Sequence, residues 1–307
     1  MSSNIVILGI FVADASYRAE RQPLIGETII GNSFSLGPGG KGSNQAVAAA
    51  MAGGNVYFIS RLGRDPFADM AHTLWEKSGV KPIIIEDLES YTGAACIFIE
   101  EKTGNNAIIV NPGAAGRISE KDIKDKSDVI AKSNVFVTQL EQPIGAAKKA
   151  LEIAKSANST TILNPAPAIP LNSRILSMCD FVTPNEIETE TITEIKVKTV
   201  RDAEKAAKIL LEKDCGAVII TLGENGAFYF DGTSSQHVPA YFAGPVVETT
   251  GAGDAFNGGF AAAIGNGAEP LEAVKFGCAT AAISVTRSGT ASSMPCLKEI
   301  RNLLSEQ

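Results

Sequence analysis

Short runs of apolar residues alternate with amphipathic stretches along most of the chain. Near-continuous apolar runs that end in Gly, Pro, Asn or Thr are typical of strands buried on both faces of a sheet. Six such runs span residues 4–10, 55–63, 134–140, 160–167, 179–185 and 216–223. Between them, the spacing of apolar residues predicts amphipathic helices over residues 67–79, 144–156 and 200–213. The alternation predicts an α/β fold in which helices flank a doubly wound, mostly parallel central sheet.

Two regions, residues 11–36 and 91–111, break this alternation and have the pattern of strands joined by turns. Within the second region, residues 94–110 predict a hairpin whose turn lies at 103–106. After Gly251 the pattern is mainly helical. We therefore expect a single domain over residues 1–307, with a small β-sheet inserted from about 11–36 and 91–111 as a lid or an oligomer contact.

The composition narrows the class of protein. The chain has 307 residues, a formal net charge of −7 and five cysteines. A negative balance argues against nucleic acid and anionic membranes as partners, because both attract basic surfaces. The cysteines are scattered and form no CxxC pair, which favours reduced thiols in the cytoplasm over disulfides or a zinc site. The first apolar run lacks the flanks of a signal peptide, and no run is long enough to span a membrane.

A glycine-rich stretch, GPGGKGSNQAVAAA at residues 37–50, contains the dinucleotide fingerprint G-x-G-x-x-G. That fingerprint requires a strand directly before it, but the preceding predicted strand of the central sheet ends at residue 10. A backbone without Cβ atoms can instead contact a ligand directly. Lys41 and Asn44 would add hydrogen-bonding groups to such a site. The plain alternative is a glycine turn before an ordinary helix.

A second stretch of small residues, ETTGAGDAFNGGFAAAI, covers residues 248–264. Gly251, Ala252 and Gly253 are expected where a helix begins, and their backbone N–H groups would bind a phosphate as its charge develops. Asp254 follows directly and would take a proton from an attacking hydroxyl. In the alternative interpretation, Asp254 only stabilises the helix dipole. The pattern indicates phosphoryl transfer without a P-loop.

Two shorter motifs are consistent with a bound nucleotide. TPNEIETE, at residues 183–190, places Asn185 and Glu188 on one face of a starting helix. Oxygen ligands at this spacing suit a hydrated Mg²⁺ ion carried by a nucleotide. TLGENGA, at residues 221–227, predicts a glycine turn after a strand that would contact ribose or phosphates. A solvated helix start and a simple β-turn are the respective alternatives.

Together these residues resemble the ribokinase family of carbohydrate kinases over nearly the whole chain. In chain order, the motifs are GETIIG, GPGGKGSNQA, GRDPF, QLE, LNPAPA, TPNE, TLGENG, TGAGDAFNGGF and VTRSG. GGKGSNQAVAAA together with QLE and NPAPA is most similar to the ribokinase branch. The resemblance implies a central α/β domain with a β-sheet lid, and a homodimer formed by pairing of the lids.

The resemblance also implies roles for individual residues. Asp254 would be the catalytic base, beside an anion hole of Gly251, Ala252 and Gly253. The sugar site would consist of Asp14, Gly39, Gly40, Lys41, Asn44, Glu141 and Asp254. ATP would be bound by Asn185, Thr221, Leu222, Gly223, Glu224, Asn225 and Gly226, and Glu188 would hold Mg²⁺ through water. An activating K⁺ would be bound, mostly through backbone carbonyls, by Glu248, Thr250, Ser284, Arg287, Gly289 and Ser293.

Two positions depart from the family pattern. Ribokinases usually carry Asn two residues before the sugar-binding Asp14, and this chain has Val12. The acid of the potassium site is usually Asp, and this chain has Glu248. The first departure bears on which sugar binds, and the second bears on the geometry around the ion.

The resulting prediction is an ATP-dependent sugar kinase that phosphorylates the 5-hydroxyl of D-ribose, with Asp254 as general base. The alternative within the kinases is another furanose substrate, such as fructose, deoxyribose or a nucleoside. Two hypotheses come from other classes: a non-catalytic sugar-sensing protein and an NAD-dependent oxidoreductase. The presence of Asp254 beside its glycines argues against the sensor, and the position of the glycine fingerprint argues against the oxidoreductase.

Overall fold

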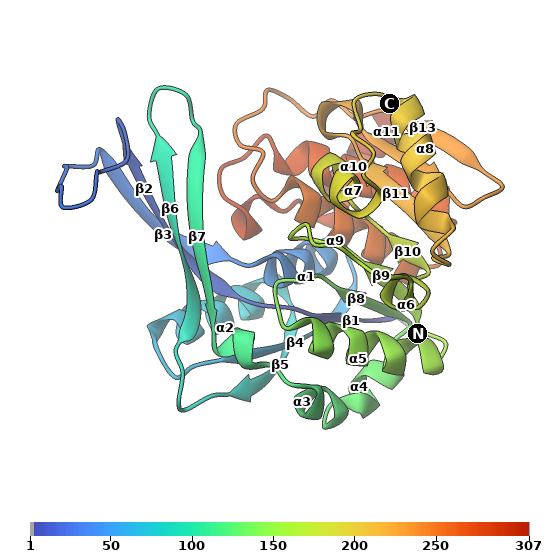
Figure 1. Cartoon of the computed structure of the whole chain (residues 1–307), viewed down its shortest axis with the longest axis horizontal. Helices are drawn as coiled ribbons and strands as arrows, with labels where there is room; N and C mark the ends of the chain where they lie inside the picture. Colours follow the sequence, from blue (N-terminus) through green and yellow to red (C-terminus); the bar gives the residue numbers. More distant parts are fainter. Residues whose placement is uncertain (1–2, 307) are drawn as a thin grey trace.

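The computed structural model describes residues 3–306 and contains a nine-stranded and a four-stranded sheet (Figure 1). The strands of the larger sheet are β1 (Asn4–Leu8), β4 (Asn55–Leu62), β5 (Lys81–Glu86), β8 (Val135–Thr138), β9 (Thr160–Leu163), β10 (Phe181–Val182), β11 (Ala217–Thr221), β12 (Ala227–Phe230) and β13 (Ser235–Val238). Their spatial order is β13-β12-β11-β10-β9-β8-β1-β4-β5. From β11 to β5 all neighbours are parallel, and β12 and β13 pair antiparallel at one edge. The six apolar runs each contain a strand, whereas β5, β12 and β13 were not predicted.

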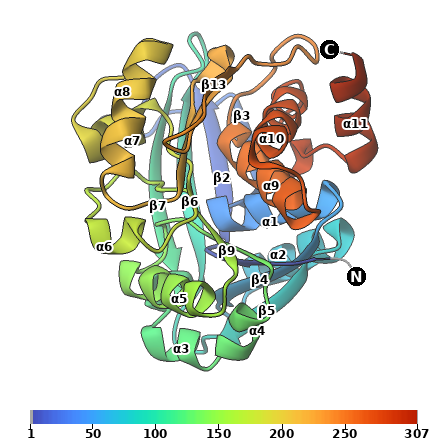
Figure 2. The same cartoon turned by 90° about the vertical axis from the view of Figure 1, so that its right-hand side faces the viewer.

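Helices cover both faces of the larger sheet (Figure 2). One face carries α1 (Lys41–Met51), α2 (Pro66–Ser78), α9 (Ala252–Gly265), α10 (Pro270–Ser284) and α11 (Leu297–Glu306). The other carries α3 (Glu120–Lys124), α4 (Ser127–Ala131), α5 (Ile144–Ser156), α6 (Ser173–Leu176), α7 (Glu186–Thr193) and α8 (Val200–Leu211). Along β1, Ile5 and Ile7 pack with the first group, and Val6 and Leu8 pack with the second. Alternate side chains of each strand enter different cores, which explains the continuous apolar runs and confirms the doubly wound fold.

The smaller sheet projects to one side of the larger one (Figure 1). It consists of β2 (Val12–Ala19), β3 (Ser33–Gly39), β6 (Thr92–Glu100) and β7 (Asn106–Gly113), in the order β3-β2-β6-β7. β6 and β7 form the predicted antiparallel hairpin, and β2 lies between β3 and β6. Large apolar side chains on this sheet are exposed to solvent. Among them, Phe34 is 56% exposed and Ile109 is 74% exposed.

The junction between β3 and α1 depends on a glycine. Gly40 has a φ of 90°, in the region that favours glycine, and a Cβ there would lie 2.6 Å from the Ile10 carbonyl oxygen. This close approach lets α1 begin at Lys41, directly after Gly40. It also places Lys41 beside the carboxyl end of β1.

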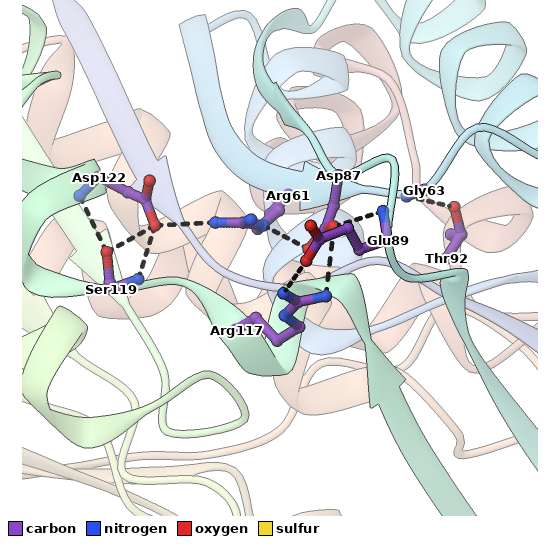
Figure 3. A network of polar contacts seen from close by, with 8 residues as sticks. All are labelled: Arg61, Gly63, Asp87, Glu89, Thr92, Arg117, Ser119 and Asp122. Atoms are coloured by element: carbon purple, nitrogen blue, oxygen red, sulfur yellow. Dashed lines mark hydrogen bonds and ion pairs between the residues drawn. The ribbon is translucent and has the colours of Figure 1, made fainter.

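A polar network lies where the chain enters and leaves the β6–β7 hairpin (Figure 3). Arg61, on β4, donates from Nε to Asp87 at 2.9 Å and from Nη1 to Asp122 at 3.0 Å. Arg117 donates to Asp87 at 3.3 Å and to Glu89 at 3.0 Å. Asp87 precedes the hairpin, and Arg117 and Asp122 follow it. Paired with two guanidinium groups, the Asp87 carboxylate can be buried, and the network ties both ends of the hairpin to the central sheet.

The strand order of the larger sheet reverses at β1. β4 and β5 lie on one side of β1, and β8 to β11 lie on the other. In open parallel sheets, ligands bind at the carboxyl ends of the strands near such a reversal. The loops after β1, β8, β9, β10 and β11 meet at this edge, so a ligand is expected to bind among them. Within residues 3–306, no helix has the length and hydropathy needed to cross a bilayer.

Candidate active site

A cavity of about 140 Å³ opens at this edge, between the ends of β9, β10 and β11 and the start of α9. It is lined by Lys41, Asn164, Ala166, Thr183, Asn185, Glu188, Thr221, Thr249, Gly251, Ala252, Gly253, Asp254 and Asn257. The residues predicted as base and anion hole therefore lie in one cavity with Lys41 and with members of both nucleotide motifs.

The start of α9 has the expected position. Gly251 precedes the helix with a φ of 84°, and the helix begins at Ala252. The Ala252 N–H donates to the Thr249 carbonyl at 3.2 Å. This N–H is therefore already paired, whereas the sequence pattern predicts that it is available to a phosphate. The N–H groups of Gly253 and Asp254 belong to the first turn, where the helix itself supplies no acceptor. They point toward the N-terminal end, which favours an anion there.

Asp254 is buried, and each of its oxygens accepts a side-chain amide hydrogen bond. Asn44 Nδ2 donates to Oδ2 at 3.0 Å, and Gln45 Nε2 donates to Oδ1 at 3.1 Å. Burial raises the pKa of Asp254, while Lys41, Asn44 and Gln45 lower it, and the net shift is upward. A buried carboxyl with a raised pKa at a cavity is the usual form of a general base.

Asn44 has spare hydrogen-bonding capacity. Its side chain is 4% exposed, and its Oδ1 has no hydrogen-bond partner in the structure. A buried acceptor without a partner costs about 1–3 kcal/mol. A ligand hydroxyl next to Asp254 would remove that cost, so the geometry fits a polyhydroxylated ligand.

The other predicted sugar-site residues surround Lys41. The Lys41 N–H donates to Glu141 Oε2 at 2.8 Å, which joins α1 to the loop after β8. Asp14 lies on β2 against Gly39, where a Cβ would overlap the Asp14 carboxylate. Pairing of β2 with β3 places Gly39 opposite Val12, and Gly40 follows Gly39 directly in the chain. The predicted set therefore comes together from β2, β3, α1, the β8 loop and α9.

Burial and the neighbouring charges shift the pKa values of these carboxyl groups and of Lys41. Burial, and then the charge of Asp254, raise the pKa of Asp14 to about 6. Burial raises the pKa of Glu141 to about 7, although the Lys41 charge opposes the shift. Burial lowers the pKa of Lys41, but Asp254, Glu141 and Glu188 outweigh it, and the net shift is upward. Lys41 is therefore a stable cation among acidic groups, and it lines the cavity where a phosphate would lie.

Asn185 and Glu188 form the N-terminal cap of α7. Glu188 Oε2 accepts from the Asn185 N–H at 2.9 Å, and Asn185 Oδ1 accepts from the Glu188 N–H at 2.8 Å. Glu188 is nevertheless buried and lines the cavity, unlike a solvated helix start. Within residues 3–306, no group of three or more His, Cys, Asp and Glu side chains could hold a metal ion. Of the two carboxylates that line the cavity, Asp254 and Glu188, Glu188 lies in the nucleotide motif, and one such ligand fits a hydrated Mg²⁺ bound mainly by nucleotide and water.

The turn predicted to contact the nucleotide follows β11. Thr221 lines the cavity and forms an isolated parallel β-bridge with Asn185. The Leu222 N–H donates to the Gly226 carbonyl at 2.8 Å. Gly223, Glu224 and Asn225 form the 3₁₀ helix η2 (Gly223–Asn225) and are exposed. The turn therefore extends from the cavity to the surface, and only Thr221 borders the cavity itself.

The residues proposed for potassium lie in the loops beside α9 and at the end of α10. Glu248 Oε2 accepts from the Gly289 N–H at 2.9 Å, so these two positions are close. The Ser284 and Ser293 hydroxyls donate to carbonyls in their own turns, and the Arg287 guanidinium pairs with Glu299. Thr250 lies in the turn before α9. Backbone carbonyls, rather than these side chains, would have to hold the ion.

Several site residues were not identified from the sequence. They are Gln45, Asn164, Thr183 and Asn257, which line the cavity or bind Asp254, and Gln139, which binds Gln45. All of them lie in or next to motifs that were quoted for other reasons, such as SNQA, QLE, NPAPA and TPNE. Their shared signal is an amide or hydroxyl directly after an apolar strand, or one turn into a glycine-led helix.

Comparison with known proteins places this site in a family. A model of the pfkB family of carbohydrate kinases matches residues 2–297. A ribokinase of Haemophilus influenzae is 36% identical over 305 residues, covering 99% of each chain. A deoxyribokinase of Salmonella typhimurium is 34% identical over 304 residues, covering 98% of this chain and 99% of the relative.

Solved structures have the same architecture over the same length. The ribokinase of Thermotoga maritima has a TM-score of 0.88 and 35% identity, with 99% of this chain and 100% of that one covered. The ribokinase of Arabidopsis thaliana, complexed with ribose and ATP, has a TM-score of 0.88 and 28% identity, with 99% of both chains covered. The chain therefore belongs to the pfkB family of carbohydrate kinases, and it is a phosphotransferase whose acceptor is an alcohol group.

Proposed function

We propose that this protein transfers the γ-phosphoryl group of ATP to the 5-hydroxyl of D-ribose. The observation that carries the proposal is the buried Asp254 carboxylate at the first turn of α9, hydrogen-bonded to Asn44 and sharing its cavity with Lys41. Support for ribose and ATP comes from the full-length similarity to ribokinases, one of them solved with both molecules bound.

In the proposed reaction, Asp254 accepts the proton of the sugar hydroxyl as that oxygen attacks the γ-phosphorus in line. The bond from the γ-phosphorus to the β–γ bridging oxygen breaks, and ADP leaves with that oxygen. Asp14, Asn44 and Glu141 hold the sugar hydroxyls. The N–H groups at the start of α9 stabilise the charge that develops on the transferring group. The Lys41 ammonium supplies a further positive charge in the same cavity.

Two cations complete the proposal. Glu188, beside Asn185, would hold a nucleotide-bound Mg²⁺ through water, and that ion would neutralise phosphate charge when bound. An activating K⁺ would lie among the carbonyls of Thr250, Ser284, Arg287, Gly289 and Ser293, with Glu248 beside it. Support for this second site is the contact between Glu248 and the Gly289 N–H, which joins the two loops.

Deoxyribose is the second candidate substrate, and Val12 favours it. Val12 lies two residues before Asp14 on β2, so the two side chains share one face of the strand. An apolar group where ribokinases usually carry an amide leaves one sugar hydroxyl without a partner. A deoxyribokinase is also 34% identical to this chain.

We further propose that the smaller sheet is a lid of the single 1–307 domain, and that two lids pair in a homodimer. Exposed apolar side chains on β3 and β7, including Phe34 and Ile109, support this assembly. A cytoplasmic location is supported by the five cysteines, all of which are free thiols.

A coupled assay of ADP release across ribose, 2-deoxyribose, fructose and nucleosides tests the proposed function. The highest kcat/KM is expected for ribose, and phosphate should be found on the 5-hydroxyl. The highest value for 2-deoxyribose would select the second candidate, and no turnover with any furanose would refute both.

A further inference from the structure

A chain of buried polar side chains lies behind the Asp254 carboxylate. Its members come from α1, from the loops after β8, β9 and β10, and from α9: Gln45, Gln139, Asn164, Thr183 and Asn257. Each is 7% exposed or less, and Gln45 and Gln139 have no exposed surface. Because Gln45 and Gln139 are completely covered by other residues, any influence on a bound ligand must pass through those residues.

The orientation of the Gln45 amide is determined from two sides. Its Oε1 accepts from Gln139 Nε2 at 2.6 Å, and its Nε2 donates to Asn164 Oδ1 at 3.0 Å. Reversing the amide would place oxygen against oxygen at Asn164. The Nε2 group therefore faces Asp254, and its second hydrogen reaches Oδ1 at 3.1 Å.

Backbone carbonyls fix the far end of this chain. Asn164 Nδ2 donates to the Thr183 carbonyl at 3.1 Å, and Asn257 Nδ2 donates to the Gly253 carbonyl at 2.8 Å. A carbonyl oxygen can only accept, so both amide nitrogens must face the backbone. The Thr183 hydroxyl then donates to Asn257 Oδ1 at 2.6 Å. The amides of Gln45, Asn164 and Asn257 thus each have one possible orientation, and Gln45 presents an N–H donor to Asp254.

Two glycines make room for Gln139. A Cβ at Gly9 would lie 2.5 Å from Gln139 Oε1, and a Cβ at Gly42 would lie 2.9 Å from the same atom. Gly42 belongs to the glycine-rich motif at the start of α1, and Gly9 follows β1. Part of the motif therefore accommodates the amide chain behind the base.

We propose that Gln45 is a positioning residue that fixes the orientation of the Asp254 carboxylate for proton transfer. The inference rests on the proposed role of Asp254 as general base. Of the two amides that bind this carboxylate, Asn44 has a free Oδ1 that can also bind sugar, whereas both ends of Gln45 are used within the protein. Loss of the Gln45 amide should therefore affect turnover and leave sugar binding unchanged.

Charged groups from α1, β2, the loop after β8 and α7 act on Asp254. Lys41 on α1 stabilises the ionised carboxylate, whereas Asp14 on β2, Glu141 after β8 and Glu188 on α7 are coupled to it as like charges. Against that background, Gln45 is a neutral donor to the ionised form. Its removal should move the acid limb of the kcat profile to higher pH, since the ionised carboxylate loses a hydrogen bond.

The test is Gln45→Met, which keeps an unbranched side chain and removes the donor. We expect kcat to fall about 10- to 100-fold, in the range for losing a hydrogen bond to a charged group, with KM for the sugar changed by about twofold or less. Gln139→Met should act in the same direction with a smaller effect. Gln142→Met is the matched control, because that buried amide bonds to Thr138 and to the Gln139 carbonyl and does not reach Asp254.

A double-mutant cycle separates positioning from a structural role. In an Asp254→Asn background, Gln45→Met should cause almost no further loss of residual turnover, because its effect passes through the carboxylate. The same fractional loss in both backgrounds, or an unchanged acid limb, would overturn the inference. If Gln45→Met does not fold, Gln139→Met in the same cycle decides in its place. Full turnover in Asp254→Asn alone would remove Asp254 from the mechanism and the inference with it, whereas no turnover of any furanose by the wild-type protein would refute the proposed function.

Discussion

Asn44 and Asp254 are 210 residues apart in the chain, and the amide nitrogen of the first lies 3.0 Å from a carboxylate oxygen of the second. Asn44 lies in the first turn of α1 and Asp254 in the first turn of α9. These two helices pack against each other: a Cβ at Gly258 of α9 would lie 2.4 Å from the Ala48 Cβ of α1. Both glycine motifs therefore begin helices whose N-termini meet at one point.

Asp254→Asn tests the base directly. The substitution keeps the size of the side chain and its place beside Asn44, so the fold and sugar binding should be retained. Turnover should fall by roughly 10²–10⁴, the range for losing a general base. Single-turnover kinetics with ribose measure the effect, and calorimetric titration with ribose is the control for binding. A variant with more than half of the wild-type rate would remove Asp254 from the mechanism.

Asp14→Asn should stabilise the ligand-free protein above pH 6. The pKa of Asp14 in the folded protein is about 6, against 3.8 for an ordinary aspartate side chain. A raised carboxyl pKa means that ionisation disfavours the folded state, so the cost appears as pH rises through this window and is absent below it. The gain at pH 8 is at most about 3 kcal/mol, from the size of the shift.

Urea unfolding at pH 4.5 and pH 8 measures this effect. The stabilisation by Asp14→Asn should be clearly larger at pH 8, and activity should be lost at both values. Asp69→Asn, at an exposed position of α2, is the matched control for loss of a carboxylate. Equal stabilisation by Asp14→Asn at the two pH values would show that the shift is not the cause.

Val12→Asn tests the sugar preference. Val12 is 3% exposed, shares a strand face with Asp14 and lies opposite Gly93 of β6. An amide at this position would supply a partner for a sugar hydroxyl that otherwise stays unsatisfied, at a cost of about 1–3 kcal/mol. We expect kcat/KM for ribose to increase relative to that for 2-deoxyribose. If the ratio does not move, Val12 does not face the substrate.

Potassium should activate the enzyme more strongly than sodium. Glu248 is one methylene longer than the usual Asp, and its carboxylate already accepts the Gly289 N–H. Glu248→Asp should therefore change the apparent affinity for K⁺ and leave KM for the sugar unaffected. Initial rates across K⁺, Na⁺ and tetramethylammonium chloride at constant ionic strength measure the effect. Identical rates in all three salts would argue against a functional cation site.

The assembly can be tested at the smaller sheet. Wild-type protein should sediment at about twice the chain mass of 32.1 kDa, because pairing covers the exposed apolar face. Ile109→Glu, on β7, should shift the equilibrium to the single chain at micromolar concentration. Ile144→Glu, on α5 outside that sheet, is the matched control, since Ile144 is also an exposed isoleucine. A wild-type protein that sediments only as a single chain would contradict the proposed homodimer.

The sequence by itself determined the six central strands of the larger sheet and the positions of the two glycine motifs. Strands such as β1 and β8 are buried on both faces, so their apolar runs are continuous and easily recognised. β5, β12 and β13 lie at or near the sheet edges and have weaker patterns, and they were missed. Asp254 was identifiable because a helix start made of small residues has a local signature that does not depend on distant parts of the chain.

Only the tertiary structure decided which polar groups meet. Gln45 and Gln139 are ordinary amides in sequence, and they become a support for Asp254 because β8, β9 and β10 end at one edge beside two helix N-termini. Arg61 and Asp87 likewise form a pair because β4 and β5 lie side by side in the sheet. Hydrogen bonds between such groups depend on distances of about 3 Å between residues far apart in the chain. Spacing along the chain does not specify those distances, and the packing of helices on the sheet does.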